Sequence, residues 1–332
     1  MKKSDVVQHI LQNKKTDFSL CETGEAFAPT NIALCKYWGK RNTELNLPVT
    51  SSLSIALPDK GAFTTLSLRN TANDLIILNG KELAQDTKFV LRVKEYLDLF
   101  RKEKEWALQI EIKMNIPVAA GLASSACGFA SLVLALDDLF KWQLSKRELS
   151  ILARLGSGSA SRSLWNGFVE WHAGVNADGM DSYAEPSDIK WKELCVGIIS
   201  ISDQEKPVSS RIAMQRTVET STLYQTWPAQ VSQDMNKIKQ ALNQKNFSLL
   251  GETSESNALT MHATMLSATP PVCYFLPETI AAMHKVWDLR SQGCEVYFTQ
   301  DAGANLKLLF LQADEARIKK IFSEMEVIQV FN

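Results

Sequence analysis

The chain has 332 residues, of which 45% are hydrophobic and 22% are charged, as in ordinary globular proteins. This length is enough for two domains, or for one large domain with a cleft between lobes. The formal net charge of -1 provides no overall field to attract nucleic acid or an anionic membrane. We therefore expect no nucleic-acid partner and no membrane partner, and local cations and backbone amides must hold any anionic ligand.

Cysteines, histidines and the N-terminus point to a reducing compartment. The six cysteines form no C-x-x-C pair, and the four histidines lack the spacing of zinc ligands. Neither a disulfide framework nor a protein metal site is expected. The start, MKKSDVVQHILQNKK, has basic residues but no apolar segment typical of a signal peptide. These patterns predict a cytoplasmic protein with reduced thiols.

The first unusual segment spans residues 28–57 and contains the letters NIALCKYWGKR. Two lysines and an arginine surround a tyrosine and a tryptophan in an otherwise apolar stretch. A charged turn between two strands is one interpretation. An anion pocket is favoured, because ammonium groups and a phenol hydroxyl are suitable donors for phosphate oxygens.

Residues 108–140 predict a strand, a turn of small residues and a helix. Apolar and polar residues alternate over 108–116, which is typical of a half-buried strand. Apolar residues then recur every three or four positions in a helix that begins near Ser124 or Ser125. A membrane helix is disfavoured, because the uncharged stretch is interrupted by Asn, Pro, Gly and Ser. The turn GLASSA could cradle phosphates at the helix N-terminus, or merely allow tight packing, and this stretch alone does not decide between them.

A second glycine- and serine-rich stretch, GSGSAS, follows the next predicted helix. Ser145 and Glu148 form a capping box, and this helix continues to about Leu155 and breaks at Gly156. By composition GSGSAS is a flexible linker. A linker fits poorly here, because an apolar strand follows at 168–171.

Two further segments place a charged residue at a helix start or in a turn. A strand over 195–201 precedes a helix that Ser209 or Ser210 can cap, with Arg211 in its first turn. Two apolar strands within 296–311 are joined by a D-A-G turn that contains Asp301. An aspartate in such a turn is more often a turn former than a catalyst.

Taken together, N-I-A-x-x-K-Y-W-G-K, P-V-A-A-G-L-A-S-S-A, G-S-G-S-x-x-R-S and D-A-G-x-N resemble the mevalonate diphosphate decarboxylases of the GHMP kinase superfamily. The likeness runs from about residue 28 to about 311. It implies an α+β, two-lobed GHMP kinase fold with the active site in the cleft between the lobes. An N-terminal ribosomal protein S5 domain 2-like lobe with the ATP phosphate loop would span 18–188, and a C-terminal ferredoxin-like lobe with the catalytic aspartate would span 189–332. The linking stretch VNADGMDSYAEPSDIK has the composition of a loop.

The resemblance implies ATP-dependent decarboxylation of mevalonate 5-diphosphate to isopentenyl diphosphate in the mevalonate pathway of isoprenoid biosynthesis. The 3-hydroxyl would be phosphorylated first, and ADP, phosphate and carbon dioxide would be released. The implied cofactors are ATP and Mg²⁺, and no residue is assigned as a direct metal ligand. By position, the implied residues are Asp301, Arg162 and Lys36 for catalysis; Tyr37, Trp38, Gly39, Lys40, Ser157, Gly158, Ser159, Arg162, Ser210 and Arg211 for the substrate; and Gly121, Ala123, Ser124 and Ser125 for ATP.

Within this implied site, Asp301 would be the base or the orienting group for the 3-hydroxyl. Lys36 with Mg²⁺ would stabilise the transferring phosphoryl group, and Arg162 would hold the carboxylate through paired donors. Leu75 departs from the pattern, since eukaryotic members often carry arginine there, and Arg211 is expected to substitute as a phosphate ligand.

Three alternatives remain beside this interpretation. The chain could act on mevalonate 5-phosphate, or it could be a mevalonate 3-kinase that does not decarboxylate. It could also be a non-catalytic binding protein that keeps the GHMP fold. The presence of Asp301, Lys36 and Arg162 together favours full decarboxylation. We expect a homodimer, although no residue pattern in the sequence establishes the oligomeric state.

Overall fold

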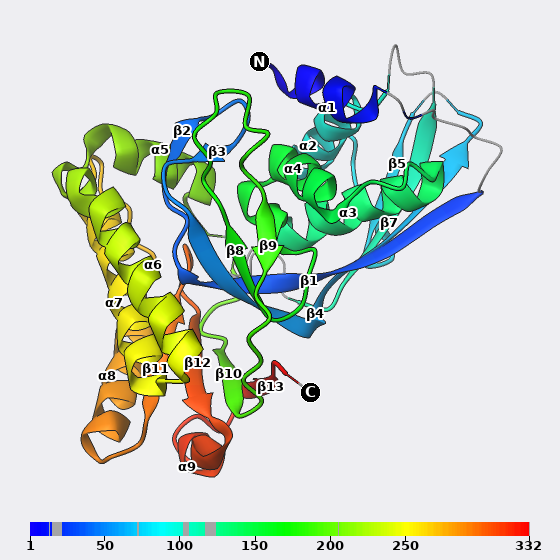
Figure 1. Cartoon of the computed structure of the whole chain (residues 1–332). Helices are drawn as coiled ribbons and strands as arrows, with labels where there is room; N and C mark the ends of the chain where they lie inside the picture. The colour runs from blue at the N-terminus through cyan, green and yellow to red at the C-terminus, as the bar shows by residue number, and fades with distance from the viewer. Residues whose placement is uncertain are drawn as a thin grey trace.

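The computed structural model describes residues 1–12, 14, 22–71, 73–101, 106–116, 124–204 and 206–331 (Figure 1). Strands from the first half of the chain form a seven-stranded sheet. Its order is β6-β5-β7-β4-β8-β9, with β1 paired to β4. The strands are β1 (Thr23–Cys35), β4 (Ser52–Arg69), β5 (Leu75–Leu78), β6 (Lys81–Glu82), β7 (Ala107–Met114), β8 (Phe168–Trp171) and β9 (Ala184–Pro186).

Strand β4 organises this sheet because it pairs with three neighbours, β1, β7 and β8. The predicted alternation in β7 is confirmed: Leu108, Ile110 and Ile112 are buried, whereas Lys113 between the apolar positions is exposed. A small separate sheet consists of β2 (Lys40–Asn42) and β3 (Leu47–Pro48).

Helices of the first half lie together on one side of the seven-stranded sheet (Figure 1). Helix α3 begins at Ser124, as predicted, and packs on β1 and β4. The capping box of Ser145 and Glu148 starts α4, which ends at Gly156. GSGSAS is no linker, because it turns directly into a buried 3-10 helix, η1. The bounds are α1 (Lys3–Leu11), α2 (Lys88–Leu97), α3 (Ser124–Phe140), α4 (Lys146–Gly156) and η1 (Gly158–Arg162).

The second half of the chain forms a four-stranded antiparallel sheet in the order β11-β12-β10-β13. Helices connect β10 to β11, and β12 to β13, so the segment follows the β-α-β-β-α-β pattern of a ferredoxin-like unit. The strands are β10 (Leu194–Ile199), β11 (Val296–Gln300), β12 (Leu306–Leu311) and β13 (Glu326–Gln329). The helices are α5 (Ser210–Thr220), η2 (Thr222–Thr226), α6 (Trp227–Gln244), α7 (Phe247–Leu266), α8 (Pro277–Ser291), η3 (Gln312–Asp314) and α9 (Glu315–Lys319).

The expected α+β, two-lobed architecture is therefore confirmed. The division after residue 188 stays a prediction; the last strand of the seven-stranded sheet ends at Pro186, and the first strand of the four-stranded sheet begins at Leu194. The stretch VNADGMDSYAEPSDIK, which has the composition of a loop, is irregular except for Ala184–Pro186, which pairs with β8 as strand β9. In the described residues, no helix is long and apolar enough to cross a membrane.

One continuous core joins the two sheets and thereby fixes the site between them. Ile32 of β1, Leu250 of α7 and Tyr297 of β11 belong to the same buried cluster. Helix α7 also contacts the end of β1. Residues that follow β1 therefore lie against the second lobe.

Candidate active site

Asp301 lies directly after β11, between two lysines from different parts of the fold. Its Oδ1 atom is 2.8 Å from Lys36 Nζ, and its Oδ2 atom is 3.6 Å from Lys307 Nζ. The side chains of Lys36 and Lys307 are 2% and 1% exposed, while that of Asp301 is 21% exposed. The carboxylate therefore reaches solvent while its two cationic partners do not.

Lys36 holds its position through two further contacts with buried groups. Its Nζ donates to the carbonyl of Ala33 at 2.7 Å, and its backbone N–H donates to Oδ1 of Asn257 at 2.8 Å. The amide of Asn257 in turn donates to Asp234 of α6. Helices α6 and α7 thus hold the chain after β1, so Lys36 joins the two lobes at Asp301.

Burial and charge oppose each other at this ion cluster. Burial disfavours the charged form of Asp301, but Lys36 and Lys307 outweigh it and hold the pKa of Asp301 below its usual value. Burial lowers the pKa of Lys36 and of Lys307, and Asp301 counteracts this. The carboxylate is consequently ionised at neutral pH.

His262 of α7 supports the turn that carries Asp301. Its Nε2 lies 3.2 Å from the carbonyl oxygen of Asp301. Burial, followed by the charge of Lys36, lowers the pKa of His262 to about 3. The ring is therefore neutral, and Nε2 must donate, because a carbonyl oxygen can only accept.

Arg162 is buried at the end of η1 and is held by neutral acceptors. Its guanidinium donates to Asn31 Oδ1 at 3.2 and 3.3 Å, to the hydroxyl of Ser54 at 3.0 Å and to that of Ser52. Burial lowers the pKa of Arg162 to about 10, and Asp301 counteracts this. Within the described residues, no carboxylate forms an ion pair with Arg162. A buried guanidinium without a carboxylate partner is suited to an anionic ligand.

Tyr37 is a second buried side chain whose polar group is available to a ligand. Its hydroxyl is buried and has no hydrogen-bond partner among the described residues. The ring packs edge-on against Trp171 at 4.8 Å, and a Cβ added at Gly158 would lie 2.8 Å from the Tyr37 hydroxyl. An unpaired buried hydroxyl is costly, so a ligand that accepts its hydrogen bond would stabilise the site.

The serine hydroxyls predicted for ATP and for the substrate meet at one place. Ser125 Oγ at the start of α3 lies 3.3 Å from Ser157 Oγ, which lies 3.4 Å from Ser159 Oγ. Ser124 is the first residue of α3. Gly121 and Ala123 of the predicted ATP loop lie outside the described residues. The two predicted phosphate-binding segments are thus adjacent where the structure describes them.

Trp38 and Gly39 follow Tyr37, and the buried indole N–H of Trp38, like the Tyr37 hydroxyl, has no hydrogen-bond partner among the described residues. The indole of Trp38 is buried in the core, and its carbonyl accepts from Tyr224 and Trp227 at 3.1 and 3.0 Å. Gly39 has φ +108, and a Cβ there would lie 1.7 Å from the Tyr224 hydroxyl. Both backbone conformation and space therefore require glycine at position 39.

Lys40 and Arg211 line a separate cavity of about 280 Å³, which we call the cationic cavity. Lys40 Nζ donates to Asn46 Oδ1 at 2.7 Å. Ser209 caps helix α5 and Arg211 lies in its first turn, as predicted. Ser210 accepts a hydrogen bond from Lys206, which also donates to the carbonyl of Ala302 and so links α5 to the Asp301 turn.

Several residues of this region escaped the sequence analysis. Lys307 is the only charged residue in the apolar strand LKLLFL, and this was an available signal because lysines are rarely buried without a partner. Trp171 contacts both Tyr37 and, at 5.8 Å, the Arg162 guanidinium. Asn31 is the first residue of the N-I-A-x-x-K-Y-W-G-K motif, but its contact with Arg162 could not be read from it. Asn257 and His262 gave no local signal, since their roles depend on contacts across the two lobes.

Comparison with known proteins identifies this arrangement. The Diphosphomevalonate decarboxylase-like N-terminal domain matches residues 28–184, and the Mevalonate 5-diphosphate decarboxylase C-terminal domain matches residues 196–329. A diphosphomevalonate decarboxylase of Aspergillus fumigatus is 41% identical, in a match that covers 86% of this chain and 76% of that protein.

Solved structures agree with these matches. The mevalonate diphosphate decarboxylase from Enterococcus faecalis, described with a mevalonate diphosphate mediated ATP binding mechanism, is 40% identical, with a TM-score of 0.86 over 93% of this chain and 97% of that one. MDDEF in complex with MVAPP, AMPPCP and magnesium is 41% identical, with a TM-score of 0.87 over the same shares of the two chains. Lys36, Arg162 and Asp301 all lie within the matched regions, and the matches together show that the chain belongs to the diphosphomevalonate decarboxylase family.

Proposed function

We propose that the chain catalyses the ATP-dependent decarboxylation of mevalonate 5-diphosphate to isopentenyl diphosphate. The substrate combines a diphosphate, a tertiary hydroxyl and a carboxylate. Phosphorylation turns the 3-hydroxyl into a leaving group, and the loss of phosphate and carbon dioxide then forms the alkene. Such a substrate needs cations at both ends and a polar group at the hydroxyl, and the described residues supply all three.

The observation that carries this proposal is the ionised carboxylate of Asp301 between Lys36 and Lys307. A carboxylate with a lowered pKa is a weak base but a strong hydrogen-bond acceptor. Asp301 therefore orients the 3-hydroxyl and accepts its proton only as the phosphoryl group is transferred. Lys36 stabilises the charge on that group.

Arg162 holds the substrate carboxylate in this proposal. Its guanidinium is positioned by Asn31, Ser52 and Ser54 and still lacks an anionic partner among the described residues. The substrate diphosphate occupies the cationic cavity with Lys40 and Arg211. Burial raises the pKa of Tyr37, and the charges of Arg162 and Arg211 counteract it, which supports a place for its hydroxyl near both ends of the ligand. Ser157, which precedes η1, and Ser159 within it face the same ligand.

The described residues also fit a nucleotide with Mg²⁺. Among them, no group of three or more His, Cys, Asp and Glu side chains could hold a metal by itself. Mg²⁺ usually keeps several waters and binds through one or two carboxylates together with substrate phosphates, so no protein cage is required. The N-terminus of α3 with Ser124 and Ser125 receives the ATP phosphates. Mg²⁺ supplies charge neutralisation for phosphoryl transfer.

We also propose that the enzyme works in the cytoplasm as a homodimer. The five cysteines among the described residues are free, which supports a reducing compartment. Gel filtration with light scattering tests the dimer, and a monomer at micromolar concentration would contradict it.

The test of the reaction uses mevalonate, its 5-phosphate and its 5-diphosphate in parallel, with measurement of ADP and of trapped carbon dioxide. We expect both products in equal amounts with the 5-diphosphate. ADP without carbon dioxide would identify a 3-kinase, turnover of the 5-phosphate alone would identify the monophosphate enzyme, and no turnover would identify a binding protein.

The variant Asp301→Asn tests the role of the carboxylate. Asparagine keeps the size and the turn propensity but removes the charge, so we expect substrate and ATP to bind while turnover falls about 10² to 10⁴-fold. Turnover at saturating substrate is measured beside a thermal melt. A folded and fully active variant would remove Asp301 from the reaction.

A further inference from the structure

The cationic cavity receives a residue from a part of the chain that precedes the family match. Its wall includes Lys3 of α1, Lys40 and Asn46 of the β2–β3 region, and Arg211 with Gln215 of α5. Three elements that are distant in sequence thus contribute one cation each. Figure 1 shows α1, the β2–β3 segment and α5 on the same side of the molecule.

These cations lack direct ionic compensation. Glu219 also lines the cavity, but it accepts a hydrogen bond from Gln215 at 2.9 Å, and among the described residues none of Lys3, Lys40 and Arg211 has a carboxylate within ion-pair distance. Burial, and then the charges of Arg211 and Lys3, lower the pKa of Lys40 to about 8. Burial also lowers the pKa of Lys3, while Glu44 counteracts it. An anion in the cavity would relieve this repulsion.

Helix α1 is docked, so Lys3 has a defined place. Val6, Val7 and Ile10 are between 0% and 6% exposed and belong to the main core. The backbone N–H of Lys3 donates to Glu44 Oε1 at 3.3 Å, which ties the helix start to the turn between β2 and β3. The match to the N-terminal family model begins only at residue 28. Helix α1 is therefore an addition to the matched domain, and it places a cation at the proposed substrate pocket.

We propose that Lys3 contacts the terminal phosphate of the substrate and favours the 5-diphosphate over the 5-phosphate. This inference rests on the proposed function, in which Lys40 and Arg211 hold the diphosphate. A diphosphate ester carries roughly one more negative charge than a monophosphate ester at neutral pH, because the bridging phosphate adds one ionised oxygen. A third cation at the far end of the cavity matches this additional charge.

The test compares Lys3→Gln with Lys2→Gln and Lys3→Arg. Lys2 is exposed beside Lys3 at the cap of the same helix and does not line the cavity, so its variant removes an equal charge from the same helix. Calorimetry measures the Kd of mevalonate 5-diphosphate and of mevalonate 5-phosphate, and steady-state assays measure KM for both substrates and kcat. We expect Lys3→Gln to raise the Kd and KM for the 5-diphosphate about tenfold, with the 5-phosphate and kcat little changed. Lys2→Gln should match the wild type, and Lys3→Arg should retain most of the preference.

The outcomes separate this inference from the proposed function. If the wild type turns over the 5-diphosphate and Lys3→Gln behaves like Lys2→Gln, the role of Lys3 is wrong and the function stands. An equal loss for both substrates, or a raised KM for ATP instead, would also overturn it. If the wild type shows no turnover of the 5-diphosphate, the proposed function itself fails. A thermal melt of each charge variant shows whether α1 remains docked. The double variant Val6→Ala/Ile10→Ala loosens α1 without changing its charge. It should therefore reproduce the loss of preference for the 5-diphosphate.

Discussion

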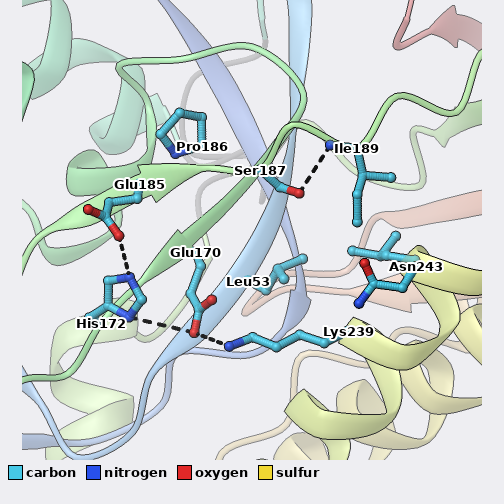
Figure 2. A pocket seen from close by; sticks show the side chains of 10 residues that line it. Leu53, Glu170, His172, Glu185, Pro186, Ser187, Ile189, Lys239 and Asn243 are labelled. Carbon is cyan, nitrogen blue, oxygen red and sulfur yellow. Dashed lines mark hydrogen bonds and ion pairs between the residues drawn. The ribbon is translucent and has the colours of Figure 1, made fainter.

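Two cavities of similar volume differ in how their charges are compensated. The first, of about 290 Å³, lies between strands β8 and β9 and helix α6, and we call it the β8–α6 cavity. Figure 2 shows four charged or titratable side chains along its wall, in a row of contacts from Glu185 through His172 and Glu170 to Lys239. Lys239 Nζ is 2.7 Å from Glu170 Oε1, and His172 Nε2 is 3.0 Å from Glu185 Oε2. The cationic cavity, of about 280 Å³, has no such pairs among its described lysines and arginine.

The comparison separates charged side chains that are paired within the fold from charged side chains that have no anionic partner and are available to a ligand. In the β8–α6 cavity, each charge already has a partner, and Lys239 of α6 bridges to β8 in the other lobe. At Arg162 the acceptors are neutral. In the cationic cavity, Glu219 also lines the wall but accepts from Gln215, and none of the three cations forms an ion pair among the described residues. Arg162 is buried, whereas Lys3 and Lys40 are partly buried and Arg211 is exposed. A buried cation without an anionic partner opposes folding, and like charges that share a cavity repel each other, so both arrangements are better explained by binding than by stability. The variants below test this distinction from the largest expected effect to the smallest.

Arg162→Lys should have the largest effect of the three. An ammonium keeps the charge but cannot reproduce the paired donors that a carboxylate accepts, so kcat/KM for mevalonate 5-diphosphate should fall about 10²-fold. Steady-state kinetics beside a thermal melt check this. Near-normal turnover in a folded variant would place Arg162 outside the site and weaken the comparison.

The pH dependence of KM for mevalonate 5-diphosphate should report the loss of the Lys40 proton. Its pKa of about 8 lies below the usual value because of burial and then the charges of Arg211, Lys3 and Arg92. The side chain is charged below this pKa and loses its proton above it, so affinity for the diphosphate should fall as pH rises. From pH 7 to pH 9, KM should increase about tenfold.

Lys40→Arg is the control for this profile, because a guanidinium stays charged over the whole range. Its KM should remain nearly constant between pH 7 and pH 9. If the wild type and Lys40→Arg have the same profile, another group causes the change. Lys3, which lines the same cavity and also has a lowered pKa, is then the first candidate. The lysines with lowered pKa values near Asp301 follow: Lys36, Lys206 and Lys307.

Lys239→Gln should have the smallest effect. The side chain of Lys239 is 45% exposed and that of Glu170 is 19% exposed, and such ion pairs contribute about 0.5 kcal/mol. We expect Tm to fall by about 1 °C, with KM and kcat unchanged. A tenfold change in KM would mean that the β8–α6 cavity also serves the substrate, and the distinction between the cavities would be lost.

Local sequence patterns predicted much of the secondary structure around the site. The alternation in β7, the start of α3 at Ser124 and the capping box of α4 depend on neighbouring residues and are confirmed. Strand β9 was missed, because Ala184–Pro186 is extended through its pairing with β8 and not through its own composition. Strand β9 could therefore not be predicted without knowing which strand lies beside it.

The motifs around Lys36, Arg162, Arg211 and Asp301 were visible as local patterns of residue type and spacing, and they sufficed to indicate the family. The sequence by itself thus determined which groups are available and which elements carry them. Only the tertiary structure decided that Lys307 shares the carboxylate of Asp301 and that Lys3 joins Lys40 and Arg211. The physical reason is that ion pairs and cavities depend on distances of a few ångströms between segments that are up to hundreds of residues apart, and packing of the two lobes on a common core sets those distances.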